Sequence, residues 1–193
     1  MDTYHYVLYI HLLSLLVGIG AATVISVCLF QLRGARELTD ALPWGRVAGK
    51  TGRMFPIAIL GLFGSGAYMT SDIWTWSTGW IQVGIAALVV LAIQGPLIAE
   101  RSGKKLEYAL KENGPGPLGE HARRMTRYPG LWVVEFSAIG LVLAIVWNMT
   151  VKASTGQAIA AALIGYGVGA GFGLLFTRAP KAEAEAVVSP SSP

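Results

Sequence analysis

One histidine lies inside a long apolar stretch of the chain and is the first candidate for chemistry. His11 falls within residues 6–32, which contain no Asp, Glu, Lys or Arg. An ionisable residue in such a segment is a candidate functional residue, because burying it there is costly without a partner. At about 100° per residue, Gly18 and Ala22 share the helical stripe of His11. Small residues there would admit either a neighbouring helix or a flat cofactor such as haem, so a packing histidine and a haem b ligand are both open.

A second ligand for haem iron or copper(I) would have to come from outside this stretch. Met69 and Met149 lie towards the same side of their own apolar runs as His11 does. Histidine with methionine is a ligand pair of cytochromes, and the same soft donors suit copper(I). A second copy of the chain is another source of a ligand, and a protein without any cofactor is a further alternative. The candidate cofactor-binding residues are His11, Gly18, Met69 and Met149, with His11 as the candidate metal ligand.

Two further polar residues mark the fourth apolar run, residues 129–149. Glu135 lies about six residues, or ~9 Å, from the start of this run. A carboxylate at that depth should be protonated, paired or beside water, and we expect a buried ion pair with Arg53 or Arg127 in preference to a proton relay. Lys152 follows the opposite end of the run. Because Glu135 and His11 belong to opposite leaflets, we do not expect them to touch.

Glycines recur every four residues in the last apolar run. They are Gly165, Gly169 and Gly173. This spacing is a signal for close helix packing, either within the bundle or against another subunit.

The elements that must position these residues are transmembrane helices. Charged residues make up only 13% of the 193 residues, against roughly 25% in soluble domains. The apolar runs that could cross a bilayer, at roughly 20 residues each, are 6–32, 55–74, 80–99, 129–149 and 157–176. They predict an all-α, polytopic transmembrane bundle of five helices, with a four-helix core and a Gly-rich fifth helix. We assign residues 1–177 to this bundle and 178–193 to a disordered cytoplasmic tail, with a short interfacial helix at 104–111.

The positions of the basic residues predict the orientation of the bundle. Every Lys and Arg except Lys152 falls in the segments 33–53, 101–127 or 178–181, which alternate crossings place on one side. Because basic residues are retained in the cytoplasm, the N-terminus is expected outside and the C-terminus inside a bacterial inner membrane. The charges flank apolar runs rather than forming a basic module, which argues against nucleic-acid binding. The expected partners are the lipid bilayer and either other membrane subunits or a second copy.

The opening sequence LYIHLLSLLVGIGAA resembles the first helix of a family of small predicted integral membrane proteins of unknown function. That family is similar to CopD-type copper-resistance proteins and, more distantly, to bacterial membrane protoporphyrinogen oxidase. The resemblance covers roughly residues 6–153 and leaves out the last apolar run. The matching positions are His11, Gly18, Gly20, Pro56, Ser65, Gly66, Pro96, Met149 and Lys152. Two features depart from the family pattern: Ala153 stands where a proline is usual, and a tryptophan that often follows the histidine is missing, since position 18 is glycine.

The resemblance implies a membrane bundle with a first-helix histidine, associated with haem, porphyrin or copper. The sequence contains no GxSxG, HExxH, CxxC or Walker motif, so no catalytic residue is predicted and an enzymatic role is not expected. We therefore expect an inner-membrane protein that binds haem b through His11 in an accessory or electron-transfer role. The alternatives are copper(I) handling and a purely structural subunit of a larger membrane complex.

Overall fold

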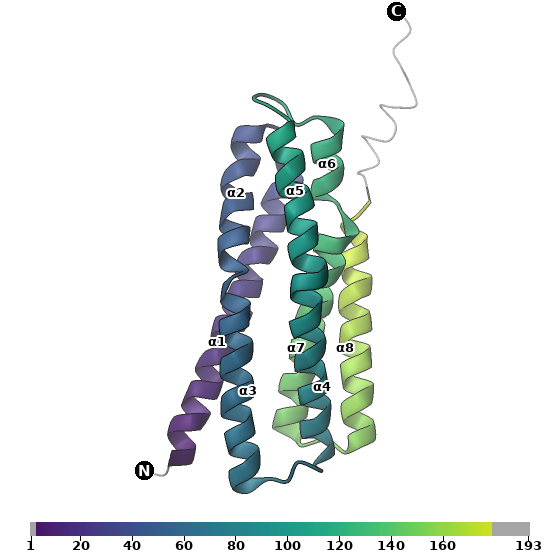
Figure 1. The fold of residues 1–193 in the computed structure, drawn as a ribbon. Coiled ribbons are helices and arrows are strands. Elements are labelled where there is room, and N and C mark those ends of the chain that lie inside the picture. Colours follow the sequence, from purple (N-terminus) through teal and green to yellow (C-terminus); the bar gives the residue numbers. More distant parts are fainter. Residues whose placement is uncertain (1–2, 179–193) are drawn as a thin grey trace, which may run out of the picture.

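The computed structural model describes residues 3–178 and shows an all-α protein with no β-strand in that range (Figure 1). The α-helices are α1 (Thr3–Gly34), α2 (Leu38–Thr51), α3 (Met54–Ile73), α4 (Gly79–Gln94), α5 (Arg101–Glu112), α6 (Glu120–Thr126), α7 (Pro129–Val151) and α8 (Thr155–Leu175). A π-helical segment, η1 (Gly95–Glu100), joins α4 to α5. The tail predicted over 178–193 lies outside the described residues except for Arg178.

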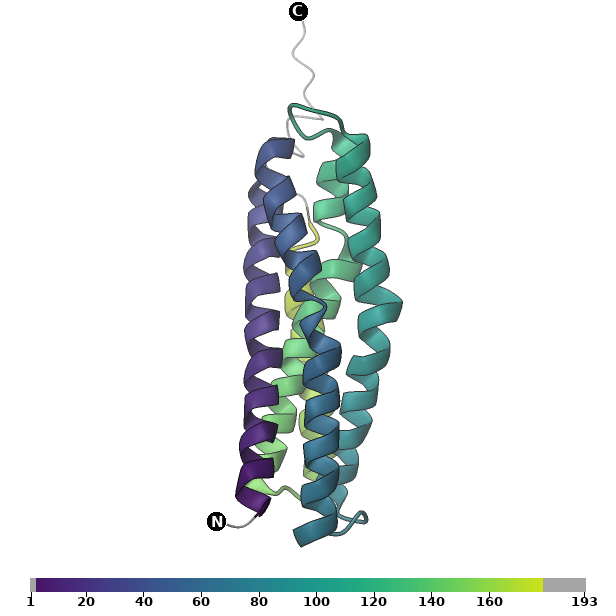
Figure 2. The ribbon, with the colours of Figure 1, turned by 60° about the vertical axis from the view of Figure 1, so that its left-hand side comes forward.

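Within residues 3–178, five helical columns are long and apolar enough to cross a membrane. They are Thr3–Gly34, Leu38–Ile73, Gly79–Glu112, Glu120–Val151 and Thr155–Leu175. The columns run side by side (Figures 1 and 2), and large apolar side chains such as Tyr9, Leu60 and Leu163 are exposed on them. Such surfaces suit a lipid bilayer, where helices satisfy their own backbone groups. The predicted all-α transmembrane bundle of five helices is confirmed.

The segments between the apolar runs at one end of the bundle are helical rather than loop-like. They form α2, α5 and α6, which we call the helical cap. α5 continues the column of α4 through η1 (Figure 1), and it includes the short helix expected at 104–111. The reason is apolar burial: Leu106 and Leu110 of α5 belong to one buried cluster with Ala41 of α2 and Ala122 of α6. Burying these side chains keeps α5 alongside the other cap helices.

The turn between α5 and α6 closes the helical cap by pairing with the turn between α1 and α2. The backbone N–H of Leu118 donates to the carbonyl of Arg36 at 2.8 Å, and that of Leu38 donates to the carbonyl of Gly116 at 3.0 Å. Gly114 and Gly116 have φ angles of +67° and +111°, which glycine adopts without the steric cost of a side chain. The two turns therefore fix the position of α2 relative to α5.

Arg33 fastens the end of α8 to α1. Its guanidinium group donates to the carbonyl of Phe176 and lies 5.8 Å and 5.6 Å from the ring centroids of Trp132 and Phe176. A cation is favourable at the carbonyl end of a helix and over an aromatic face. The rings belong to a cluster made of Phe30, Trp132, Phe136, Phe172 and Phe176. This cluster joins α1, α7 and α8 at the end of the bundle that bears the cap.

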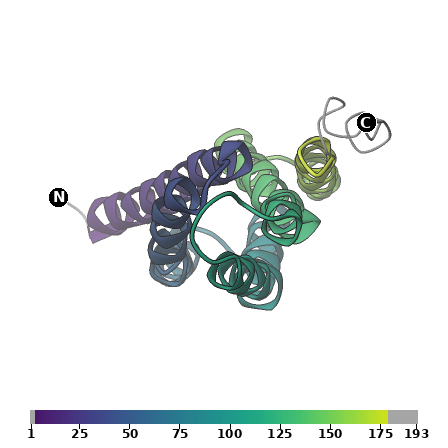
Figure 3. The ribbon, with the colours of Figure 1, turned by 90° about the horizontal axis from the view of Figure 1, so that it is seen from above.

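The glycine stripe of α8 packs against α7 of the same chain. A methyl group added at Gly169 would collide with the carbonyl oxygen of Phe136, and one added at Gly173 would lie 2.6 Å from the carbonyl oxygen of Trp132. Gly165 likewise meets a glycine of α7. Close backbone contact supplies the van der Waals attraction on which helix association in lipid depends. The stripe thus holds α8 on the bundle, at whose edge Figure 3 shows it.

We predict that Gly169→Ala destabilises the bundle and that Gly171→Ala does not. Gly171 lies on the same helix, but no atom beyond its own stretch of helix would come within 4 Å of a methyl group there. Overpacking costs about 1–3 kcal/mol, whereas alanine at an open helical position is neutral or favourable. The free energy of unfolding, measured in mild detergent titrated with SDS, checks this difference. Equal values for the two variants would contradict the packing role of Gly169.

Candidate functional site

His11 is buried between α1 and α3, about 12 Å along α1 from its first residue. The residue is 6% exposed, and its Nδ1 lies 2.9 Å from Oγ of Ser65 on α3. The ring also faces Gly66, where an added methyl group would lie 3.5 Å from Cε1. His11 therefore forms a direct polar link between the first and third helices.

Ser65 Oγ forms hydrogen bonds with Nδ1 of His11 and with the carbonyl of Gly61. The Ser65 hydroxyl donates to the carbonyl of Gly61, one turn earlier on α3. Because a hydroxyl has a single hydrogen, Nδ1 of His11 donates to Ser65 when that hydrogen is used for Gly61, and this tautomer leaves the lone pair on Nε2. Metal-bound histidines are held in the same way through their other N–H. A histidine that only links two helices is equally satisfied by this bond.

Residues of α3 fill the space beside the small residues that follow His11 on α1. A methyl group added at Gly18 would lie 3.5 Å from Cβ of Ala58, and one added at Gly61 would lie 3.0 Å from Cβ of Ser14. We call this contact, from His11 to Gly18, the α1–α3 seam. It leaves no room for a porphyrin between the two helices. His11 could serve as one ligand of haem iron, but the seam contains no space for the haem itself.

The two candidate methionines lie in different surroundings. Met69 is on α3, one turn beyond Ser65 and thus on the helix that contacts His11. Met149 packs between α7 and α4, in an apolar cluster with Ala87 and Leu141. Across residues 3–178, no group of three or more His, Cys, Asp or Glu side chains is placed to hold a metal ion.

Glu135 is buried at 8% exposure and faces α1. Its Oε1 accepts a hydrogen bond of 3.1 Å from the hydroxyl of Ser26. The partner given by the structure is therefore a hydroxyl group, where the sequence suggested Arg53 or Arg127. Ser26 follows His11 by about 15 residues, or ~22 Å along α1. Glu135 and His11 belong to separate parts of the bundle, as expected.

Sequence reasoning missed a polar cluster around Gln94, where α4 passes into η1. The amide nitrogen of Gln94 donates to the carbonyl of Val134 at 2.9 Å and to Oγ of Ser137 at 3.0 Å. The hydroxyl of Tyr166 donates to its amide oxygen at 3.1 Å. The cluster links α4, α7 and α8 beside a π-helical turn, a feature frequent at functional sites. The available signal was a glutamine in an apolar run, two residues before Pro96.

Lys152 ends α7 in a left-handed conformation, with φ of 54°. Its Nζ lies 4.9 Å from the ring centroid of Trp74, and that ring packs edge-to-face on Trp80 with centroids 5.3 Å apart. A cation over an aromatic face is favourable, so this contact ties the end of α7 to the turn between α3 and α4. The contact with Trp74 gives Lys152 a structural role in the fold.

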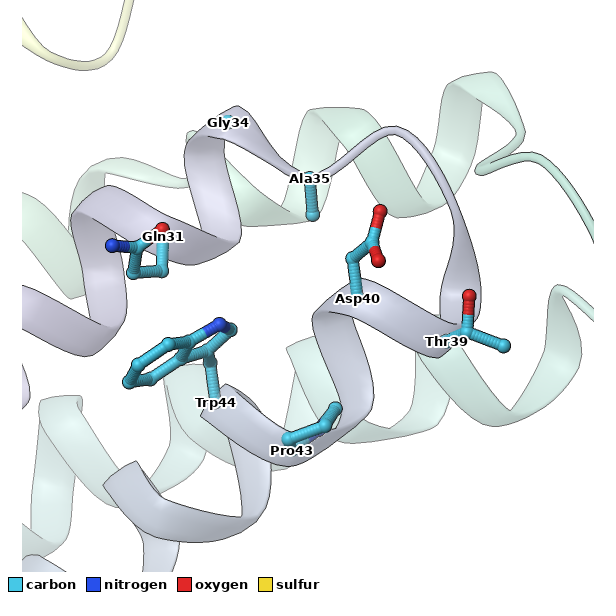
Figure 4. Close-up of a pocket in the computed structure, with 7 residues that line it drawn as sticks. All are labelled: Gln31, Gly34, Ala35, Thr39, Asp40, Pro43 and Trp44. Carbon is cyan, nitrogen blue, oxygen red and sulfur yellow. The ribbon is translucent and has the colours of Figure 1, made fainter.

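A surface depression lies between the end of α1 and α2, at the cap (Figure 4). Its lining residues are Gln31, Gly34, Ala35, Thr39, Asp40, Pro43 and Trp44. Gln31 is about 20 residues, or ~30 Å, further along α1 than His11. The depression is therefore separate from the histidine site.

Comparisons with known proteins return no match, whether with protein-family models, curated proteins or solved structures. The interpretation of the site therefore depends on the geometry of its own residues.

We predict that Ser65→Ala destabilises the bundle and that Ser71→Ala, on the same helix, does not. Ser65 bonds His11 across the α1–α3 seam, whereas the exposed Ser71 hydroxyl bonds only Ala67 of its own helix. Interhelical hydrogen bonds in membranes contribute about 0.6 kcal/mol on average and up to ~1.7 kcal/mol.

A double-mutant cycle with His11→Ala and Ser65→Ala, scored by the free energy of unfolding in detergent, measures the coupling between the two side chains. We expect a coupling energy of about 1 kcal/mol. A coupling energy of zero would show that the hydrogen bond does not stabilise the seam.

Proposed function

We propose that this chain is a non-catalytic, accessory protein of the bacterial inner membrane. The observation that carries the proposal is the α1–α3 seam, where His11 and the neighbouring small residues already serve helix packing. The helical cap adds support, because its helices share a buried apolar cluster with α1 and α7. A simple connecting loop would not need such a cluster. A folded cap suits contact with other subunits of a membrane complex.

Haem b binding in an electron-transfer role is the second candidate, and one observation favours it. In the tautomer that donates from Nδ1 to Ser65, Nε2 of His11 is a basic nitrogen that could ligate iron. Because the seam is filled, the porphyrin would have to lie outside it, and a second ligand would come from a methionine or from another copy. When bound, such a group supplies one-electron chemistry. The resemblance to the CopD-type family points in the same direction.

Copper(I) handling is the weaker alternative. It requires His11, Met69 and Met149 to act together, and Met149 packs in the apolar cluster between α7 and α4. The soft ligands that copper(I) prefers are thus divided between two helix contacts.

We expect purified protein to show no haem bands in a reduced-minus-oxidised visible spectrum, and no stoichiometric iron or copper by elemental analysis. Packing of α3 on the stripe of His11 is the physical reason. A Soret band and a sharp α-band that disappear in His11→Ala and persist in His121→Ala would overturn the structural proposal. They would establish haem b as the function of the site.

We also propose an orientation with the N-terminus outside and the cap in the cytoplasm, because the basic residues concentrate at the capped end. Single cysteines test this orientation in a Cys28→Ala background. Ser77→Cys, in the turn between α3 and α4, should react with a membrane-impermeant maleimide on intact spheroplasts. Glu112→Cys, at the end of α5, should react only after lysis. The reverse labelling pattern would contradict the orientation.

A further inference from the structure

A shallow groove lies on the helical cap, away from the histidine site. It lies between α5 and α6, and its lining residues are Lys104, Lys105, Tyr108, His121 and Met125. The lining includes the Tyr108 ring, the Met125 side chain and two lysine side chains, whose apolar stems can lie along such a surface while their ammonium groups remain outside. None of these five lining residues is acidic. The groove combines an apolar surface with positive charge.

The position of the groove along the α4–α5 column corresponds to the headgroup layer of a bilayer. Starting from Gly79, a helix needs about 20 residues to cross ~30 Å of hydrocarbon, which brings the chain to Glu100. Lys104 and Lys105 lie about one turn further on, or ~6–8 Å. The headgroup layer extends roughly 5–8 Å beyond the hydrocarbon core. By this count, Lys104 and Lys105 fall at the level of the phospholipid phosphates.

The ammonium groups of Lys104 and Lys105 are available to interact with a bound anion. Lys104 pairs with Glu100 at 2.7 Å, but both side chains are more than half exposed, and such surface pairs contribute little. Nζ of Lys105 lies 3.2 Å from the hydroxyl of Tyr128 and 4.9 Å from its ring centroid. Neither contact of Lys105 is with an acidic group. A phosphate would add an opposite charge that these contacts do not supply.

We propose that this groove binds an anionic phospholipid of the adjacent leaflet. The lipid phosphate lies between Lys104 and Lys105, and the glycerol and upper acyl region contact Tyr108 and Met125. A soluble phosphate would use only the ammonium groups, whereas a phospholipid also covers the apolar part of the groove. The proposal does not depend on whether His11 binds a cofactor.

The test measures binding of a fluorescent phosphatidylglycerol to the full chain in neutral detergent. The variant is Lys104→Gln with Lys105→Gln. The matched control is Lys50→Gln with Lys111→Gln, which removes the same charge and includes a lysine with an equivalent ion pair, Lys111 with Glu107 at 2.7 Å. Tyr108→Ser alters the apolar surface without changing the charge. Phosphatidylcholine with the same acyl chains and inorganic phosphate serve as competitors.

We expect the Lys104 and Lys105 variant to weaken phosphatidylglycerol binding about tenfold, and the control pair to weaken it less than about twofold. Tyr108→Ser should also weaken binding, and neither competitor should displace the lipid. Equal losses in both lysine pairs would show diffuse attraction to positive charge and overturn the proposal. Displacement by inorganic phosphate would identify a soluble anion as the ligand, and displacement by phosphatidylcholine would remove the need for a negative headgroup. Either result would also overturn it.

Discussion

The absence of water in the bilayer core is the constraint on which the rest of this structure depends. Backbone N–H and C=O groups there must form their hydrogen bonds within helices. Because lipid tails are as apolar as the side chains, the hydrophobic effect does not drive helices together. Helices then associate where their backbones approach closely or where polar groups meet. Gly169 brings α8 onto α7, and Gly18 brings α1 onto α3. The hydrogen bond between His11 and Ser65 acts in the same way.

The cap follows different physics because it extends beyond the hydrocarbon core. There water drives apolar side chains together, and Leu106 and Leu110 are buried with residues from the neighbouring helices. One protein thus contains two kinds of helix contact along the same columns. The membrane part is held by small residues and a few hydrogen bonds, and the cap by burial of leucine and alanine. Arg33 and the aromatic cluster lie where these two regions meet.

The sequence could predict the helices that cross the membrane, because length and apolar composition alone determine them. The packing role of Gly169 was likewise accessible from the four-residue spacing of glycines. The partners of polar residues were not, since contacts such as Ser26 with Glu135 or Tyr166 with Gln94 depend on the rotation of each helix about its axis. Helices that are apolar on all sides carry little periodic signal for that rotation. Of the cap helices, the sequence indicated α5 but not α2 and α6, whose polar residues and glycines resemble those of loops.

Disulfide cross-linking tests most directly whether the small-residue stripe of α1 lies on α3. A Cβ atom at position 18 would be 3.5 Å from Cβ of Ala58, within the usual range for a disulfide of about 3.5–4.5 Å. In a Cys28→Ala background, Gly18→Cys with Ala58→Cys should form a rapid intramolecular cross-link in membranes. Gly20→Cys with Ala58→Cys should not, because the space beside Gly20 is open. Failure of the first pair to cross-link, or a bond between two copies, would contradict the α1–α3 seam and reopen the stripe beside His11 to a cofactor.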